Sequence, residues 1–182
     1  MLDFEDLKEN TIVIDSISKR FSACGARVGV VISRNLEFIT QAAKIVQARL
    51  CVATLDQVGA AALYNNISPE YFASVRQEYR NRRDIAMAEL QKIPGIVCKI
   101  PDGAFYIMAK LPVDNAEKLL MFLLDEFSDN DETVMFAPGS GFYATPGVGL
   151  DEIRMAYVLN SVDLKRAVNL LAMGIKAYNE KK

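Results

Sequence analysis

The sequence has 182 residues, of which 51% are hydrophobic and 24% are charged, a composition typical of a globular chain. Its 21 basic and 23 acidic residues give a net charge of -2, so charge favours neither a nucleic acid nor a membrane as partner. No apolar run approaches the ~20 residues that span a bilayer. The sequence contains no histidine, which excludes Ser-His-Asp and Cys-His catalysis and histidine metal sites. Three cysteines without paired spacing favour reduced thiols and hence a cytoplasmic location.

Two strands and two helices are predicted in the first third of the chain. Residues 11–14 (TIVI) form a β-branched run, which we interpret as a buried strand. Residues 28–33 (VGVVIS) repeat this pattern after a glycine-containing loop. Asn35 can cap a helix over residues 35–50, and the small residues of the next segment predict a second helix over residues 56–64.

A long helix is predicted next. Ser68-Pro69-Glu70 is a typical helix start, with a capping serine, proline in the first position and an acid in the first turn. Apolar side chains over residues 72–93 fall on one stripe, and Pro94-Gly95 ends the helix. The rest of the helix surface is rich in arginine, which we interpret as a solvated face rather than a binding patch: Arg76, Arg80 and Arg83.

Short strands and helices alternate after residue 95, which predicts a small α/β unit. We place a domain boundary near residue 66, so that residues 1–66 and 67–182 form separate domains. The predicted elements are strands over 96–100 and 104–111 joined by a turn, a helix over 115–127, strands over 133–136 and 152–159, and a last helix over 164–178.

The segment between the first two strands carries the densest set of reactive side chains. It reads DSISKRFSACGARVG from Asp15 to Gly29 and follows a predicted strand, where active-site residues of α/β sheets collect. Arg20 and Arg27 disfavour the ammonium form of Lys19 by like charge, which frees its amine to attack a carbonyl group. Guanidinium and hydroxyl groups are also donors for a phosphate. A polar surface turn explains these residues equally well, so both interpretations stay open on this ground alone.

A family resemblance favours the catalytic interpretation. The string SISKRFSACGARVG resembles the lysine motif of fold-type I pyridoxal-phosphate enzymes, specifically the class I/II aminotransferases: S-x-S-K, then Arg eight residues after the lysine, a small residue and glycine. The resemblance implies that the catalytic Lys19 binds pyridoxal 5'-phosphate as an aldimine. It also implies that Ser16 and Arg27 hold the cofactor phosphate and that Ser18 shapes this cofactor-binding loop.

A second segment, far downstream, resembles the closing motif of the same family. It comprises residues 137–143 (APGSGFY), Gly149 and residues 152–157 (EIRMAY). Its sequence is most similar to that of a bacterial aspartate-aminotransferase-like branch of the family. Arg154 interrupts an apolar strand pattern, which is costly unless its charge is paired or faces a cavity. The resemblance implies that Arg154 binds the substrate α-carboxylate through two parallel hydrogen bonds. The other interpretation is an edge-strand arginine that points to solvent. Residues 102–106 (DGAFY) resemble the family's small-domain turn, which approaches the substrate side, and a hairpin turn followed by core aromatic residues explains each of them at least as well.

The resemblance also implies that this chain is the carboxy-terminal part of a longer enzyme. Residues 1–66 would be a remnant of the large cofactor domain, and residues 67–182 a long linking helix with the small α/β domain. The family's phosphate loop, ring-stacking aromatic residue and ring-nitrogen aspartate cannot be located, and Asp15 is not that aspartate. We therefore expect the chain alone to be inactive as a transaminase, and the strands within residues 11–33 to have exposed edges.

For the whole enzyme, the resemblance implies exchange of an amino group between an amino acid and a 2-oxo acid in a homodimer. Aspartate is a candidate substrate, and Arg34 and Arg49 are candidates for binding a second carboxylate. Two alternatives are a pyridoxal-phosphate-dependent β-elimination lyase and a non-catalytic aminotransferase-like effector domain of a transcription regulator. A stand-alone interaction module ranks last, because it leaves the motifs of Lys19 and Arg154 unexplained.

Overall fold

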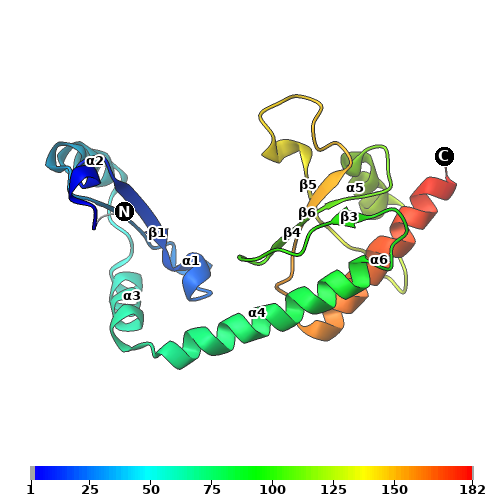
Figure 1. The fold of residues 1–182 in the computed structure, drawn as a ribbon, viewed down its shortest axis with the longest axis horizontal. Coiled ribbons are helices and arrows are strands. Elements are labelled where there is room, and N and C mark those ends of the chain that lie inside the picture. The colour runs from blue at the N-terminus through cyan, green and yellow to red at the C-terminus, as the bar shows by residue number, and fades with distance from the viewer. Residues whose placement is uncertain (1–2, 182) are drawn as a thin grey trace. The chain divides into compact units, whose positions relative to one another are not determined.

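The chain divides into two compact units, Met1–Tyr71 and Phe72–Lys182. Residues 3–181 are described by a computed structural model. The boundary between the units falls in the first turn of the long helix α4 (Pro69–Leu90), and Figure 1 shows the elements of each unit.

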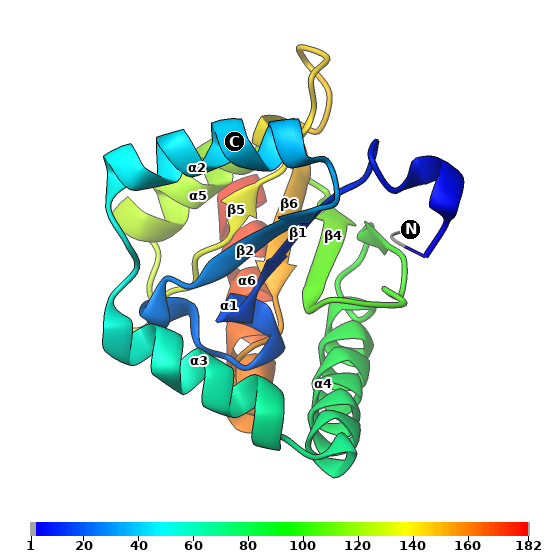
Figure 2. The same cartoon turned by 90° about the vertical axis from the view of Figure 1, so that its left-hand side faces the viewer.

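The unit Met1–Tyr71 is built on an antiparallel hairpin. Strand β1 (Ile12–Ser16) pairs with β2 (Gly29–Ser33), from Ile12 opposite Ser33 to Ser16 opposite Gly29. The short helix α1 (Ile17–Arg20) lies at the end of this hairpin in both Figure 1 and Figure 2. The remaining elements are α2 (Leu36–Arg49), α3 (Thr54–Asn66) and 3-10 turns at Glu5–Leu7 and Cys24–Ala26.

The helix cap predicted at Asn35 is confirmed, because its side-chain oxygen accepts a hydrogen bond from the Phe38 N–H at 2.8 Å. Both predicted strands and both predicted helices of this unit are present. The predicted burial of the first strand is wrong: Ile12 is 48% exposed and Ile14 is 80% exposed. The reason is that the sheet of this unit has only two strands among the described residues, so no further strand shields the side chains of Ile12 and Ile14.

The unit Phe72–Lys182 contains a four-stranded antiparallel sheet in the order β3-β4-β6-β5. Strands β3 (Val97–Cys98) and β4 (Tyr106–Lys110) form the predicted hairpin. Strand β6 (Glu152–Ala156) pairs with β4 on one side and with β5 (Ala137–Pro138) on the other. The helices are α4, α5 (Ala116–Asp125) and α6 (Ser161–Glu180).

The sheet separates an apolar core from a second face that carries polar and aromatic side chains. Ile107 and Ala109 of β4 and Ile153 of β6 are buried in the core. Because side chains alternate along a strand, Tyr106 and Arg154 lie on the opposite face. Figure 1 shows α4 and α6 running beside the sheet, and helix residues complete the core: Ala86, Met87 and Leu90 of α4, Leu119 and Leu123 of α5, and Leu164, Val168, Leu171 and Ile175 of α6.

One predicted strand of this unit is wrong in position. Residues 133–136 form no strand, and the ladder with β6 begins only at Ala137–Pro138. The hydroxyl of Thr133 donates to the carbonyl oxygen of Leu123 at 2.7 Å, and Phe136 packs against the core. The apolar side chains of this segment therefore serve packing on the core rather than strand pairing.

The last predicted strand ends earlier than expected, at Ala156 rather than 159, because the chain turns into α6. Asn160 caps this helix by accepting hydrogen bonds from the N–H groups of Val162 and Asp163, both at 3.0 Å. None of the helices formed by residues 3–181 has the length and apolar character needed to cross a membrane.

Helices α5 and α6 pack closely at Gly174, and this contact leads to a stability prediction. A β-carbon at position 174 would overlap Cδ2 of the buried Leu123. We expect Gly174→Ala to lower the free energy of unfolding by about 1–3 kcal/mol, because an extra methyl group overpacks a filled core. Urea denaturation of the full chain, followed by circular dichroism, measures this change.

The matched control is Gly59→Ala in α3, where no heavy atom beyond the chain neighbours and the local helix backbone lies within 4 Å of the added β-carbon. There we expect no loss and a gain of up to about 1 kcal/mol, because alanine is a better helix former than glycine. Equal stability of the Gly174→Ala and Gly59→Ala variants would show that the packing of α5 on α6 is looser than described.

Candidate active site

The predicted lysine loop joins β1 to β2, and Ser16 organises its first turn. The Oγ atom of Ser16 accepts a hydrogen bond from the Ser18 N–H at 3.1 Å and so caps α1. The same oxygen lies 2.9 Å from Oγ of Ser18 and 3.2 Å from the carbonyl oxygen of Val28. Both predicted serines are thus brought together, next to the strand that follows Arg27.

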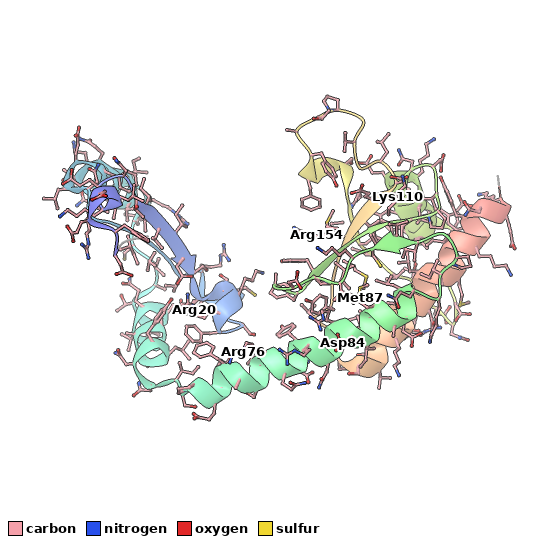
Figure 3. The ribbon with its side chains drawn as sticks, viewed as in Figure 1. Arg20, Arg76, Asp84, Met87, Lys110 and Arg154 are labelled. Carbon is pink, nitrogen blue, oxygen red and sulfur yellow. The ribbon has the colours of Figure 1, made fainter. Side chains whose placement is uncertain are left out.

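Lys19 lies on α1 with an exposed side chain. Its neighbour Arg20, which Figure 3 labels, donates to Oδ2 of Asp15 at 2.7 Å and lies 5.9 Å from the ring centre of Tyr64. The charge of Arg20 is therefore compensated by Asp15, which weakens the expected like-charge effect of Arg20 on Lys19. Asp15 itself serves as the partner of Arg20 in this loop.

Arg27 ends the loop in a left-handed backbone conformation, with φ of 55°. Its Nη1 donates to the carbonyl oxygen of Cys24 at 2.9 Å, and the side chain is exposed. No carboxylate pairs with it among residues 3–181. A guanidinium carries five N–H donors, so donors beyond the one used by Cys24 remain. Together with the hydroxyls of Ser16 and Ser18, this donor set fits the phosphate group of pyridoxal phosphate.

The second predicted site surrounds Arg154 on β6, which Figure 3 labels. Arg154 lies opposite Met108 of β4 and opposite Ala137 of β5, on the face of the sheet away from the core. Its Cζ atom is 4.5 Å from the ring centre of Tyr106 and 4.3 Å from that of Phe142. Within the described part of the chain, the side chain of Arg154 makes no ion pair and no hydrogen bond, so its N–H groups are available to donate to a carboxylate ligand.

The two other arginines considered for substrate binding are placed without such an enclosure. Arg34 lies 3.8 Å from a carboxylate oxygen of Glu5, and Arg49 is exposed in the last turn of α2. Sequence reasoning missed the contribution of Phe142 and Tyr106 to the arginine site, although both lie in segments that carry the family resemblance. The sequence feature that could have indicated these two residues is the aromatic side chain in each of the two segments that lie near Arg154 of β6. No group of histidine, cysteine, aspartate or glutamate side chains within residues 3–181 is arranged to hold a metal ion.

Comparison with known proteins identifies the family. Residues 2–171 match the family described as aminotransferase class I and II. The chain therefore belongs to this family, as the lysine and arginine motifs predicted, and it corresponds to the carboxy-terminal part of the fold.

Curated relatives carry aminotransferase names. The chain is 30% identical to the aspartate aminotransferase of Bacillus subtilis, with 95% of this chain and 43% of the relative covered. It is also 30% identical to the LL-diaminopimelate aminotransferase of Nitratidesulfovibrio vulgaris, with 94% and 42% covered. The chain thus spans about two fifths of the length of the curated relatives it matches.

Solved structures confirm the predicted fold class. The α-aminoadipate aminotransferase of Thermus thermophilus, solved in complex with N-(5'-phosphopyridoxyl)-L-leucine, matches with a TM-score of 0.78 at 24% identity. That match covers 94% of this chain and 43% of the Thermus chain. The α/β fold is therefore that of the fold-type I pyridoxal-phosphate enzymes, as predicted.

Proposed function

We propose that this chain is the part of a pyridoxal-phosphate-dependent transaminase that supplies the cofactor-binding lysine and the substrate-binding arginine. The enzyme exchanges an amino group between an amino acid and a 2-oxo acid. The observation that carries the proposal is the loop from Ser16 to Arg27, which joins the two strands of the hairpin and carries two adjacent hydroxyls, an amine and a guanidinium. Membership of the aminotransferase family supports the same proposal.

Each of the cofactor-binding residues has a separate task. Arg27 and the hydroxyl of Ser16 bind the phosphate group through charge-assisted hydrogen bonds, and Ser18 fixes the position of Ser16. When bound, pyridoxal phosphate supplies an electron sink that stabilises negative charge at the α-carbon of the substrate. The Nζ atom of Lys19 removes the α-proton as a general base and then serves as the general acid.

Arg154 orients the substrate. Its planar guanidinium suits the two oxygens of an α-carboxylate, which it binds through two parallel N–H···O hydrogen bonds. The lack of a carboxylate partner for Arg154 within residues 3–181 supports this role, because a partly buried guanidinium without a counter-ion favours an anionic ligand.

Aspartate is the amino acid that we propose as substrate, on the strength of the aspartate aminotransferase among the relatives. We further propose a homodimer in the cytoplasm. The three unpaired cysteines, Cys24, Cys51 and Cys98, fit a reducing compartment, and the exposed apolar side chains of the β1–β2 hairpin fit burial against further polypeptide.

Product analysis tests the reaction. The protein assayed is a fusion of this chain with the rest of the aminotransferase fold. The added part corresponds to the portion of the relatives that lies outside the two fifths of their length matched by this chain. With aspartate and 2-oxoglutarate we expect glutamate and oxaloacetate in equal amounts. With cystathionine, whose β-carbon carries a thiol leaving group, hydrolytic release of homocysteine, pyruvate and ammonia without amino transfer to 2-oxoglutarate would instead assign a β-elimination lyase. The absence of both reactions would favour a non-catalytic effector domain. From the 182-residue chain alone we expect no turnover, because the stacking and ring-nitrogen residues of the family are not found in it.

A further inference from the structure

Two aromatic rings enclose the guanidinium of Arg154. Its Cζ atom lies 4.3 Å from the ring centre of Phe142 and 4.5 Å from that of Tyr106, both well inside the ~6 Å range of cation–π attraction. The rings come from different segments: Tyr106 is the first residue of β4, and Phe142 is the last residue of a 3-10 helix, Ser140–Phe142. The two segments are brought together only by the folded sheet.

The register of the sheet explains the position of Tyr106. Tyr106 is paired with Ala156, and Met108 is paired with Arg154, so Tyr106 and Arg154 are diagonal neighbours on the same face. Diagonal pairs across an antiparallel ladder are within reach when one side chain is aromatic and the other is long.

Phe142 is held by contacts of its neighbours with Glu152 of β6. The Gly139 N–H donates to the carbonyl oxygen of Glu152 at 2.6 Å, and a β-carbon at Gly139 would lie only 2.6 Å from Cβ of Glu152. The Tyr143 hydroxyl donates to Oε2 of the same Glu152 at 2.5 Å, which raises the pKa of Tyr143. Phe142 itself is 48% exposed, so its place over Arg154 is set by these two anchors rather than by burial. Figure 2 shows the segment that follows projecting beyond the sheet.

The N–H donors of the Arg154 guanidinium make no hydrogen bond or ion pair within residues 3–181 and so are available for a ligand. A guanidinium is planar, its faces attract aromatic rings, and its N–H donors all lie in the plane. Two rings within cation–π distance of Cζ restrict the rotation of the side chain, and neither forms a hydrogen bond with its donors. Because arginine has many rotamers, ordering it before the ligand arrives removes an entropic cost from binding.

We propose that Tyr106 and Phe142 are positioning residues that fix the plane of the Arg154 guanidinium for a carboxylate. The loop Gly139–Tyr143, anchored on Glu152, delivers Phe142 to this position. The inference rests on the proposed function, since it assigns to Arg154 a carboxylate ligand. It adds two residues that determine how tightly and in which orientation that carboxylate is bound.

Nuclear magnetic resonance of the arginine side chains in the full chain tests this inference. The probe is propionate, a carboxylate without other functional groups, and the control ligand is propionamide, which has the same size and no charge. Arg154→Lys assigns the Nε–Hε resonance of Arg154. In the wild-type chain we expect this resonance to be shifted upfield by ring currents, and to move saturably with propionate but not with propionamide.

The variants separate positioning from general stability. We expect Phe142→Leu and Tyr106→Leu each to move the free resonance towards those of exposed arginines and to weaken propionate binding about three- to tenfold. Phe142→Tyr keeps an aromatic face and is expected to retain both properties. Phe4→Leu replaces an exposed aromatic residue of the other unit and is expected to change neither.

Two results would overturn the inference, and only the second would also contradict the substrate-binding role of Arg154. If wild-type Arg154 binds propionate and both leucine variants bind it equally well, the rings do not position the arginine, while the carboxylate site of the proposed function stands. If the Arg154 resonance in the wild-type chain does not respond to propionate, the inference fails together with the substrate-binding role of Arg154.

Discussion

Replacement of Lys19 by alanine is expected to abolish amino transfer in a protein that joins this chain to the rest of the family's fold. The amine of Lys19 is the proposed general base, and loss of such a group lowers turnover by about 10²–10⁴-fold. The loss of its covalent bond to the cofactor adds to this effect. The rate of oxaloacetate formation from aspartate measures it.

The control for this variant is Lys44→Ala. Lys44 is an exposed lysine of α2 whose side chain donates to the amide oxygen of Gln41 at 2.9 Å, away from the lysine loop in sequence. We expect Lys44→Ala to retain wild-type turnover. A Lys19→Ala protein with unchanged turnover would remove the lysine from the catalytic mechanism and with it the interpretation of the whole loop.

Replacement of Arg154 by leucine is the second large effect. A hydrogen bond between charged groups contributes about 1.5–3 kcal/mol, so loss of the carboxylate partner is expected to raise KM about 10–100-fold. The turnover number is expected to change less, because the guanidinium binds the unreactive end of the substrate in the ground state and in the transition state alike.

Steady-state kinetics with aspartate as the varied substrate separates these two quantities. Arg80→Leu is a suitable control, since Arg80 is an exposed arginine on α4. A variant at Arg154 that lowers turnover at an unchanged KM would show that this arginine acts on the chemical step instead of on substrate binding.

Local signals were sufficient to predict most elements of the fold. Each helix start predicted from a capping side chain depends on residues within one turn, and Asn35 illustrates this: its hydrogen bond spans only three residues. The hairpin of β3 and β4 was likewise predictable from the turn residues 101–103. These features need no knowledge of distant parts of the chain.

Burial and strand pairing could not be derived in the same way. The β-branched residues of β1 predicted a buried strand, yet burial depends on neighbouring strands, and β1 pairs only with β2 among the described residues. The apolar residues 133–136 fit a strand pattern, but their side chains pack on the core without forming a ladder. In both cases the tertiary environment, which the pattern does not contain, decided the outcome.

The candidate site likewise contains residues that a local motif predicts and residues whose position depends on the tertiary structure. Ser16, Ser18, Lys19 and Arg27 lie within twelve residues, so a sequence motif describes them completely. The surroundings of Arg154 depend instead on the register of β4 against β6 and on the loop that carries Phe142. Arg154 could be recognised from its motif, whereas its aromatic neighbours required the structure.

The most direct test of the account is to identify the lysine that binds pyridoxal phosphate. The cofactor is added to the 182-residue chain and to the protein with the complete fold, the imine is reduced with borohydride, and the modified residue is mapped by mass spectrometry. We predict selective modification of Lys19 in the protein with the complete fold. Selective modification of Lys19 in the 182-residue chain as well would show that the loop alone is sufficient to bind the cofactor. Modification spread over other lysines, with Lys19 unmodified in both proteins, would contradict the assignment of this loop as the cofactor site.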